Sequence, residues 1–188
     1  MGISLEDLKE CIKLGVEIDK VEEVIKIVDL KSYLSFVRCS IRDLEEIKQW
    51  IKSGFSPKEA KEWKENGIDL EEAKEWKDIE CDVNKAKEWK KEGFNIKEAK
   101  EWKDIGCDLY EAIKWIGEGY GIKEVKKWKS IGCGMYDAEE WKAIGCDVKE
   151  AKKWMKYGYD IEEAKEWIKI SKKDKNKKLN FLYNDDSE

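Results

Sequence analysis

The sequence predicts an all-α protein, an α-solenoid of about thirteen single-helix repeats of thirteen residues each. Three observations predict it: tryptophan recurs every thirteen residues, helix-capping residues open most units, and glycines close most of them. Each repeat is expected to be a helix of about ten residues followed by a three-residue Gly-x-Asp corner. The tryptophans are Trp50, Trp63, Trp76, Trp89, Trp102, Trp115, Trp128, Trp141, Trp154 and Trp167.

Residues 1–42 carry a degenerate form of the repeat and are predicted to cap the N-terminal end of the array. A helix should begin after Ser4, which starts a capping box, and end at Gly15. In the next two frames, Val24 and Val37 stand at the tryptophan position and the closing glycines are missing. Atypical terminal units are expected in an array, because an end helix has a neighbour on one side only.

Residues 43–172 form ten regular units. Eight of them open on a side chain that can accept a hydrogen bond from the first helical turn, while Gly121 and Gly134 stand at the two exceptions. The closing glycines are placed to adopt the left-handed conformation that ends many helices. Glu80 occupies one closing position, so mild strain or a changed corner is expected there. The opening residues are Asp43, Ser56, Asp69, Asp82, Asn95, Asp108, Asp147 and Asp160.

The apolar positions of a unit cover about half of the helix circumference when successive residues advance by about 100°. The fourth helical residue is nearly always alanine and the seventh is tryptophan, while charged residues predominate at the second, fifth, sixth and ninth positions. A helix covered by both the preceding and the following unit needs such a wide apolar face. Alanine allows a neighbouring helix to approach closely, and the tryptophan fills the space beside it.

The ends of successive units alternate over part of the chain. Units that begin at positions 69, 95 and 121 end in Ile-x-Cys, whereas those at 82 and 108 end in Glu-x-aromatic. This favours 26-residue pairs whose helices alternate between two layers, but the alternation fails near the C-terminal end. A two-layer arrangement and a one-helix spiral therefore both stay open.

The array is expected to be one continuous solenoid domain, followed by a different kind of segment. Residues 173–188 are rich in lysine at their start and are predicted to form a partly disordered C-terminal tail. The tail lysines suggest nucleic acid as a partner, but the formal net charge of −5 disfavours it.

The composition argues against most catalytic and metal sites. The chain has no histidine, the commonest general base and zinc ligand, and none of its six cysteines forms a C-x-x-C pair. The aspartates that open units place one carboxylate at each corner, which capping explains better than calcium binding. We therefore expect no enzyme activity, cofactor or metal. With no membrane-spanning run and no leader, we expect a soluble, cytoplasmic protein with reduced thiols.

Function is predicted from the absence of reaction chemistry and from departures within the repeat. The tryptophan ladder is interpreted as core between repeats rather than as a stacking platform. A non-catalytic scaffold that binds another protein is the preferred hypothesis; single-stranded nucleic-acid binding through lysine rows and tryptophan edges is the alternative, and a carboxylate-based enzyme is third. No membrane partner is expected. The candidate partner-binding residues are Tyr110, Ile113, Ile116, Tyr120, Met135 and Tyr136.

Overall fold

The computed structural model describes residues 3–173, and these residues form thirteen helices and no strands, which confirms the all-α prediction. From α4 onward the first helical residues are evenly spaced, thirteen positions apart. The helices are α1 (Leu5–Lys13), α2 (Ile18–Ile27), α3 (Leu30–Arg38), α4 (Leu44–Lys52), α5 (Pro57–Glu65), α6 (Leu70–Asp78), α7 (Val83–Lys91), α8 (Ile96–Asp104), α9 (Leu109–Gly117), α10 (Ile122–Ser130), α11 (Met135–Ala143), α12 (Val148–Lys156) and α13 (Ile161–Lys173).

Each regular helix begins and ends through local hydrogen bonds that the sequence encodes. At the start of α5, the Glu59 amide donates to Ser56 Oγ at 3.2 Å and the Ser56 amide donates to Glu59 Oε2 at 2.8 Å. At the end of α4, the Gly54 amide donates to the Ile51 carbonyl and the Phe55 amide to the Trp50 carbonyl. This closure needs a positive φ, which is +72° at Gly54.

Glu80 adopts the same corner without the help of glycine. Its φ is 57°, and the Cys81 amide still donates to the Trp76 carbonyl at 2.9 Å. The corner at Glu80 therefore has the same hydrogen bonding as the glycine corners. Of strain and a changed corner, the two outcomes expected for Glu80, the positive φ corresponds to strain. A left-handed conformation costs a residue with a Cβ about 1 kcal/mol.

The core consists of alanines and tryptophans that recur from helix to helix. The alanines at the fourth helical position have no exposed surface, and nine of the ten tryptophans are buried. No charged or polar residue is buried among residues 3–173. Trp167 is the correction to the expected core: it is 39% exposed, because α13 is the last described helix and no described helix covers its outer side.

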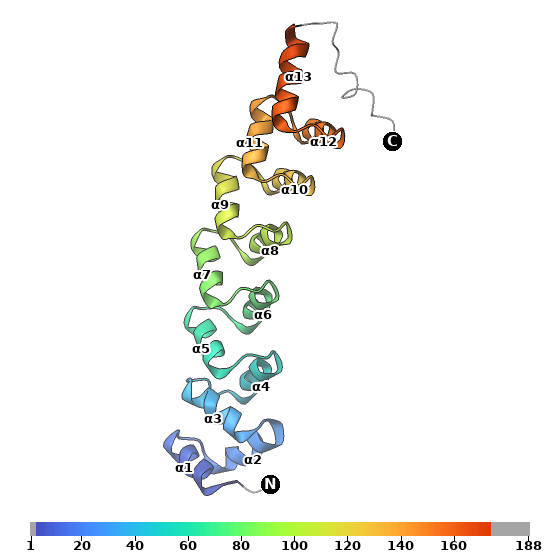
Figure 1. Ribbon diagram of the computed structural model, residues 1–188. Helices are drawn as coiled ribbons and strands as arrows, with labels where there is room; N and C mark the ends of the chain where they lie inside the picture. Colours follow the sequence, from blue (N-terminus) through green and yellow to red (C-terminus); the bar gives the residue numbers. More distant parts are fainter. Residues whose placement is uncertain (1–2, 174–188) are drawn as a thin grey trace. The chain divides into compact units, whose positions relative to one another are not determined.

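The chain divides into two compact units, Met1–Lys100 and Glu101–Glu188, and the boundary falls inside α8. In the first unit, α3, α5 and α7 lie in one column and α2, α4 and α6 lie beside them in a second (Figure 1). Helix α3 contacts both α1 and α5, its neighbours within the column, as well as α2 and α4. α3 begins one residue earlier than the regular spacing predicts, because Asp29 caps it through the Ser32 amide at 2.8 Å.

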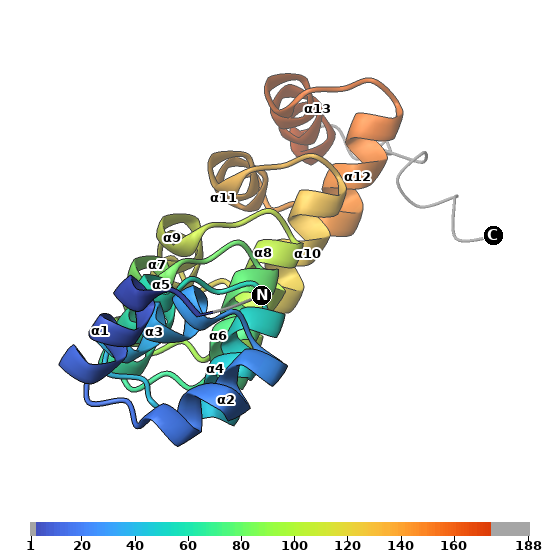
Figure 2. The same ribbon diagram turned by 90° about the horizontal axis from the view of Figure 1, so that it is seen from below.

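In the second unit, α9, α11 and α13 again form one column and α10 and α12 the other, as both ribbon views show (Figures 1 and 2). Between residues 3 and 173, no helix combines the length and the apolar character that a bilayer span requires. The predicted tail, residues 173–188, falls outside the described residues except for Lys173, which ends α13.

Candidate partner-binding surface

Helix α9 carries a row of large apolar side chains on its solvent side. Tyr110 is 64% exposed, Ile113 39% and Ile116 47%. Because these residues are spaced three apart, their side chains follow one another along the helix surface. In α6 the corresponding positions hold Glu71, Lys74 and Lys77. The row therefore replaces a charged surface with an apolar one.

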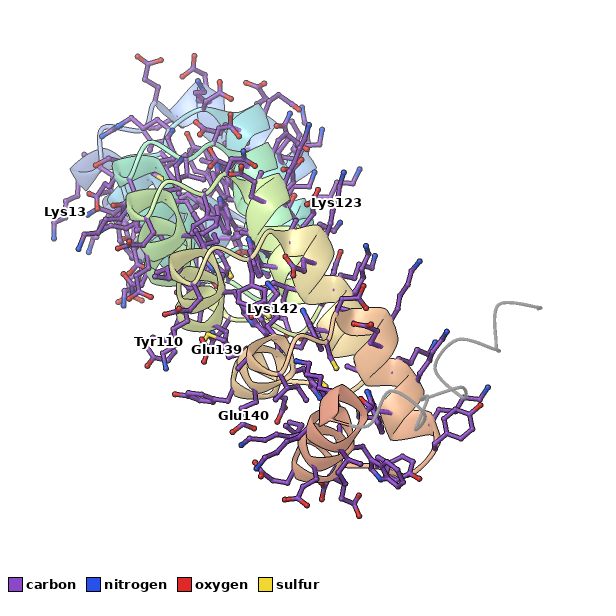
Figure 3. The ribbon with its side chains drawn as sticks, turned by 90° about the horizontal axis from the view of Figure 1, so that it is seen from above. Lys13, Tyr110, Lys123, Glu139, Glu140 and Lys142 are labelled. Carbon is purple, nitrogen blue, oxygen red and sulfur yellow. The ribbon has the colours of Figure 1, made fainter. Side chains whose placement is uncertain are left out.

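Tyr136, at the start of the neighbouring helix α11, extends this surface and is 69% exposed. The Lys114 ammonium lies 4.6 Å from the centroid of the Tyr110 ring and 5.9 Å from that of the Tyr136 ring. A side-chain hydrogen bond with Tyr110 raises the pKa of Lys114. Figure 3 shows Tyr110 projecting outward from α9. We call the set Tyr110, Ile113, Ile116 and Tyr136 the α9–α11 patch.

Of the two other residues predicted for this surface, one lies in the core and the other is half-buried. Tyr120 is only 4% exposed and packs edge-on against Trp115, with ring centroids 4.9 Å apart. Tyr120 follows a closing glycine, and Phe55 packs on Trp50 from the same position of its own unit. This position in the repeat could have indicated that Tyr120 belongs to the core. Met135, the first residue of α11, is half-buried.

Ion pairs connect successive helices at a fixed separation of eighteen residues. The third residue of one helix, a glutamate, accepts from the eighth residue of the next helix, a lysine. In α4 and α6 the same glutamate also accepts from the indole N–H of its own helix, as in Trp76 Nε1 to Glu72 at 3.2 Å. The pairs are Glu46–Lys64, Glu72–Lys90, Glu111–Lys129 and Glu124–Lys142, with N–O distances of 2.6, 2.8, 3.4 and 2.9 Å.

Grooves form between a helix and the next helix of its column. The helix that lies between these two in the sequence contributes its eighth residue to the lining of the groove. The α5–α7 groove has a volume of about 320 Å³, and Lys77 lies at its edge. The α10–α12 groove, about 780 Å³, has Lys142 at that position. The α11–α13 groove, about 450 Å³, has Met155 there, with its Sδ 3.8 Å from Cys133 Sγ. Sequence reasoning missed these grooves because their walls come from helices 26 residues apart.

Within residues 3–173 no group of three or more cysteine, aspartate or glutamate side chains could hold a metal ion. None of the six cysteines forms a disulfide, and five of them are buried. Burial raises the pKa of Cys146 to about 11, so this thiol stays protonated and is a poor nucleophile at neutral pH.

No protein-family model matches the chain, and no characterised protein matches it in sequence.

Proposed function

We propose that the protein is a non-catalytic helical-repeat scaffold, an α-solenoid of thirteen-residue repeats, that binds another protein through the α9–α11 patch. The observation that carries the proposal is the exposure of Tyr110, Ile113 and Ile116 on α9, where α5, α6, α8 and α10 present charged residues at all three positions. Tyrosine and isoleucine held on a helix lose little conformational freedom on binding, and tyrosine is enriched at protein interfaces.

The repeat interpretation is supported by features that recur with the helix spacing. The buried alanine at the fourth position, the buried tryptophan at the seventh and the eighteen-residue ion pairs return from helix to helix. Helices of nine residues are too short to be stable alone and depend on their neighbours. A tryptophan ladder that joins neighbouring helices in this way leaves the outer positions free to vary, which suits a binding scaffold.

A protein partner is preferred to single-stranded nucleic acid because of where the indole rings lie. Bases stack on exposed aromatic faces, whereas Trp63, Trp115 and Trp128 are each at most 3% exposed. The exposed tyrosines of the patch accompany two isoleucines, a combination that suits an apolar protein surface.

The test is affinity capture from the native host with the full chain as bait. The variant Tyr110→Glu plus Ile113→Lys introduces residue types that stand at the same positions in α6. We expect it to fold normally by circular dichroism and to lose partners that the unmodified chain retains. The matched control is Glu71→Lys plus Lys74→Glu, which exchanges two residues that form an ion pair at 3.0 Å on α6. This control should retain the partners. Equal recovery of all partners by both variants would refute the proposed surface.

The nucleic-acid alternative is tested with the same purified protein. The buried indoles predict tryptophan emission that is blue-shifted and unaffected by a single-stranded oligonucleotide. Strong quenching that falls steeply with added salt would instead favour nucleic acid over a protein partner.

A further inference from the structure

We propose that the α10–α12 groove is a second docking surface, which binds an acidic, extended segment of a partner protein. Five lysines line the groove, against two carboxylates, Glu124 and Asp147. One lysine, Lys142, is paired with Glu124 at 2.9 Å. The other four have no carboxylate partner among residues 3–173, and they are Lys123, Lys127, Lys149 and Lys152.

This charge distinguishes the α10–α12 groove from the α5–α7 groove. The α5–α7 groove is built largely from the equivalent positions, 65 residues earlier, and four carboxylates and one lysine line it. Lys123 and Lys152 also have lysine equivalents in α5 and α7, so the lysines that the α10–α12 groove adds are Lys127 and Lys149. In α5, Lys58 pairs with Glu62 one turn further on, at 3.7 Å. In α10 the equivalents are Lys123 and Lys127, so a stabilising pair has become two like charges on one face. Bound carboxylates would relieve that repulsion.

The groove is separate from the α9–α11 patch. Figure 3 shows Lys123 on the opposite side of this unit from Tyr110, with Lys142 lying between them. The lysines come from α10 and α12, whereas the patch comes from α9 and α11. The docking proposal therefore does not depend on the patch.

The size and the lining of the groove indicate the class of occupant. A nine-residue helix is roughly 13 Å long, which matches about four residues of an extended chain. Trp128 lies at the base but has no exposed surface, so no aromatic face is available for stacking nucleotide bases. Unpaired ammonium groups around a short groove complement a run of aspartate or glutamate side chains.

The experiment measures fluorescence anisotropy of a labelled ten-residue peptide of alternating aspartate, glutamate and glycine, titrated with the full chain. A peptide with asparagine and glutamine in place of the acids is the ligand control. The test variant is Lys127→Glu plus Lys149→Asn, which introduces the residues of the α5–α7 groove, Glu62 and Asn84. We expect at least a tenfold loss of affinity. The protein control, Lys58→Glu plus Lys87→Asn, makes the same net charge change on α5 and α7 and should bind normally.

The reverse exchange tests sufficiency. Glu62→Lys plus Asn84→Lys is added to the variant Lys127→Glu plus Lys149→Asn. It gives the α5–α7 groove the two lysines that the α10–α12 groove has lost, and it should raise the affinity for the acidic peptide at least threefold. Equal weakening by Lys127→Glu plus Lys149→Asn and by the control variant would overturn the proposal, since binding would then follow net charge alone. Tighter binding of a single-stranded oligonucleotide, lost in the same variant, would overturn the choice of occupant.

A last outcome concerns this chain's own acidic residues beyond the described part. If Asp185→Asn, Asp186→Asn and Glu188→Gln together raise the affinity for the peptide tenfold or more, those residues compete for the groove. That result would assign the groove to the chain itself and overturn docking of a partner. Unchanged affinity supports the partner.

Discussion

The α5–α7 groove and the α10–α12 groove have the same construction and opposite charge. Several positions hold the same residue in both grooves, among them the buried tryptophan, the buried cysteine and the capping aspartate. The positions that face solvent differ, as in Glu62 against Lys127 and Asn84 against Lys149. The comparison teaches that two grooves with the same buried tryptophan and cysteine can differ in charge through their exposed residues alone. The shared pairs are Trp63 and Trp128, Lys77 and Lys142, Cys81 and Cys146, Asp82 and Asp147, and Val83 and Val148.

The largest effect is expected from the tryptophans at the base of the two grooves. Trp63→Ala and Trp128→Ala should each lower the free energy of unfolding by about 3–5 kcal/mol, because each removes a buried indole and leaves a cavity. Trp167→Ala should cost about half as much or less, since that ring is already 39% exposed. Urea unfolding followed by circular dichroism measures the three values. Equal losses at all three sites would contradict the assignment of the core.

The next effect comes from the corners that follow the middle helices of the two grooves. Glu80 has φ 57° where its equivalent, Gly145, has φ 87°. Glu80→Gly should stabilise the protein by about 1 kcal/mol, and Gly145→Ala should destabilise it by a similar amount. A Cβ at Gly145 would meet no atom within 4 Å, so the backbone conformation alone decides the second value. Differential scanning calorimetry should show melting shifts of opposite sign; shifts of the same sign would show that side-chain contacts of Glu80 outweigh its strain.

A smaller effect is expected at the edge of the grooves. Lys142 pairs with Glu124 at 2.9 Å and lies 3.8 Å from the Tyr120 ring centroid, while Met155 holds the same position in the α11–α13 groove. Lys142→Met should lower the free energy of unfolding by less than about 1 kcal/mol, as an exposed ion pair and a cation–π contact allow. In 1 M salt this loss of unfolding free energy should become smaller, because salt screens the ion pair that the variant lacks. A loss as large as that of Trp128→Ala would mean that this lysine holds the groove together.

The smallest effect is expected at the first residues of α5 and α10, where Ser56 caps one helix and Gly121 the other, and it should depend on pH. Hydrogen bonds from the Ser56 side chain and amide hold the pKa of Glu59 below its ordinary value of 4.5. A lowered carboxyl pKa contributes stability that is fully present above the ordinary value and is lost as the pH falls through the lower folded value. Ser56→Gly, which copies the Gly121 cap of α10, should cost a few tenths of a kcal/mol at pH 7.

At pH 3, which lies below the ordinary value of 4.5, that difference should narrow, because the lower pH favours the protonated form of Glu59 and weakens its pairing with Ser56. Urea unfolding of the parent and of Ser56→Gly at the two pH values measures it. A difference that grew on acidification would contradict the role of Glu59 as a charged capping partner.

Local chemistry made the helices predictable from sequence. Asp69 and Ser56 mark helix starts, and the glycines mark ends, through hydrogen bonds between residues at most five apart. The burial of Tyr120 and the exposure of Trp167 depend on which helices lie nearby. The grooves were not predictable, because their charge balance compares side chains from helices two apart in sequence, and the repeat pattern alone left their arrangement open.

Helices alternate between two columns within a unit. The face on which a given helix lies therefore depends on whether an even or an odd number of helices precedes it in that unit. Loss or gain of one helix with its corner, thirteen residues, would move each later helix of that unit to the other column and exchange the faces on which the α10–α12 and α11–α13 grooves lie. Loss or gain of 26 residues would leave each face in place. Duplications and deletions in pairs are therefore the changes that this architecture can tolerate while keeping its ligands on the same side.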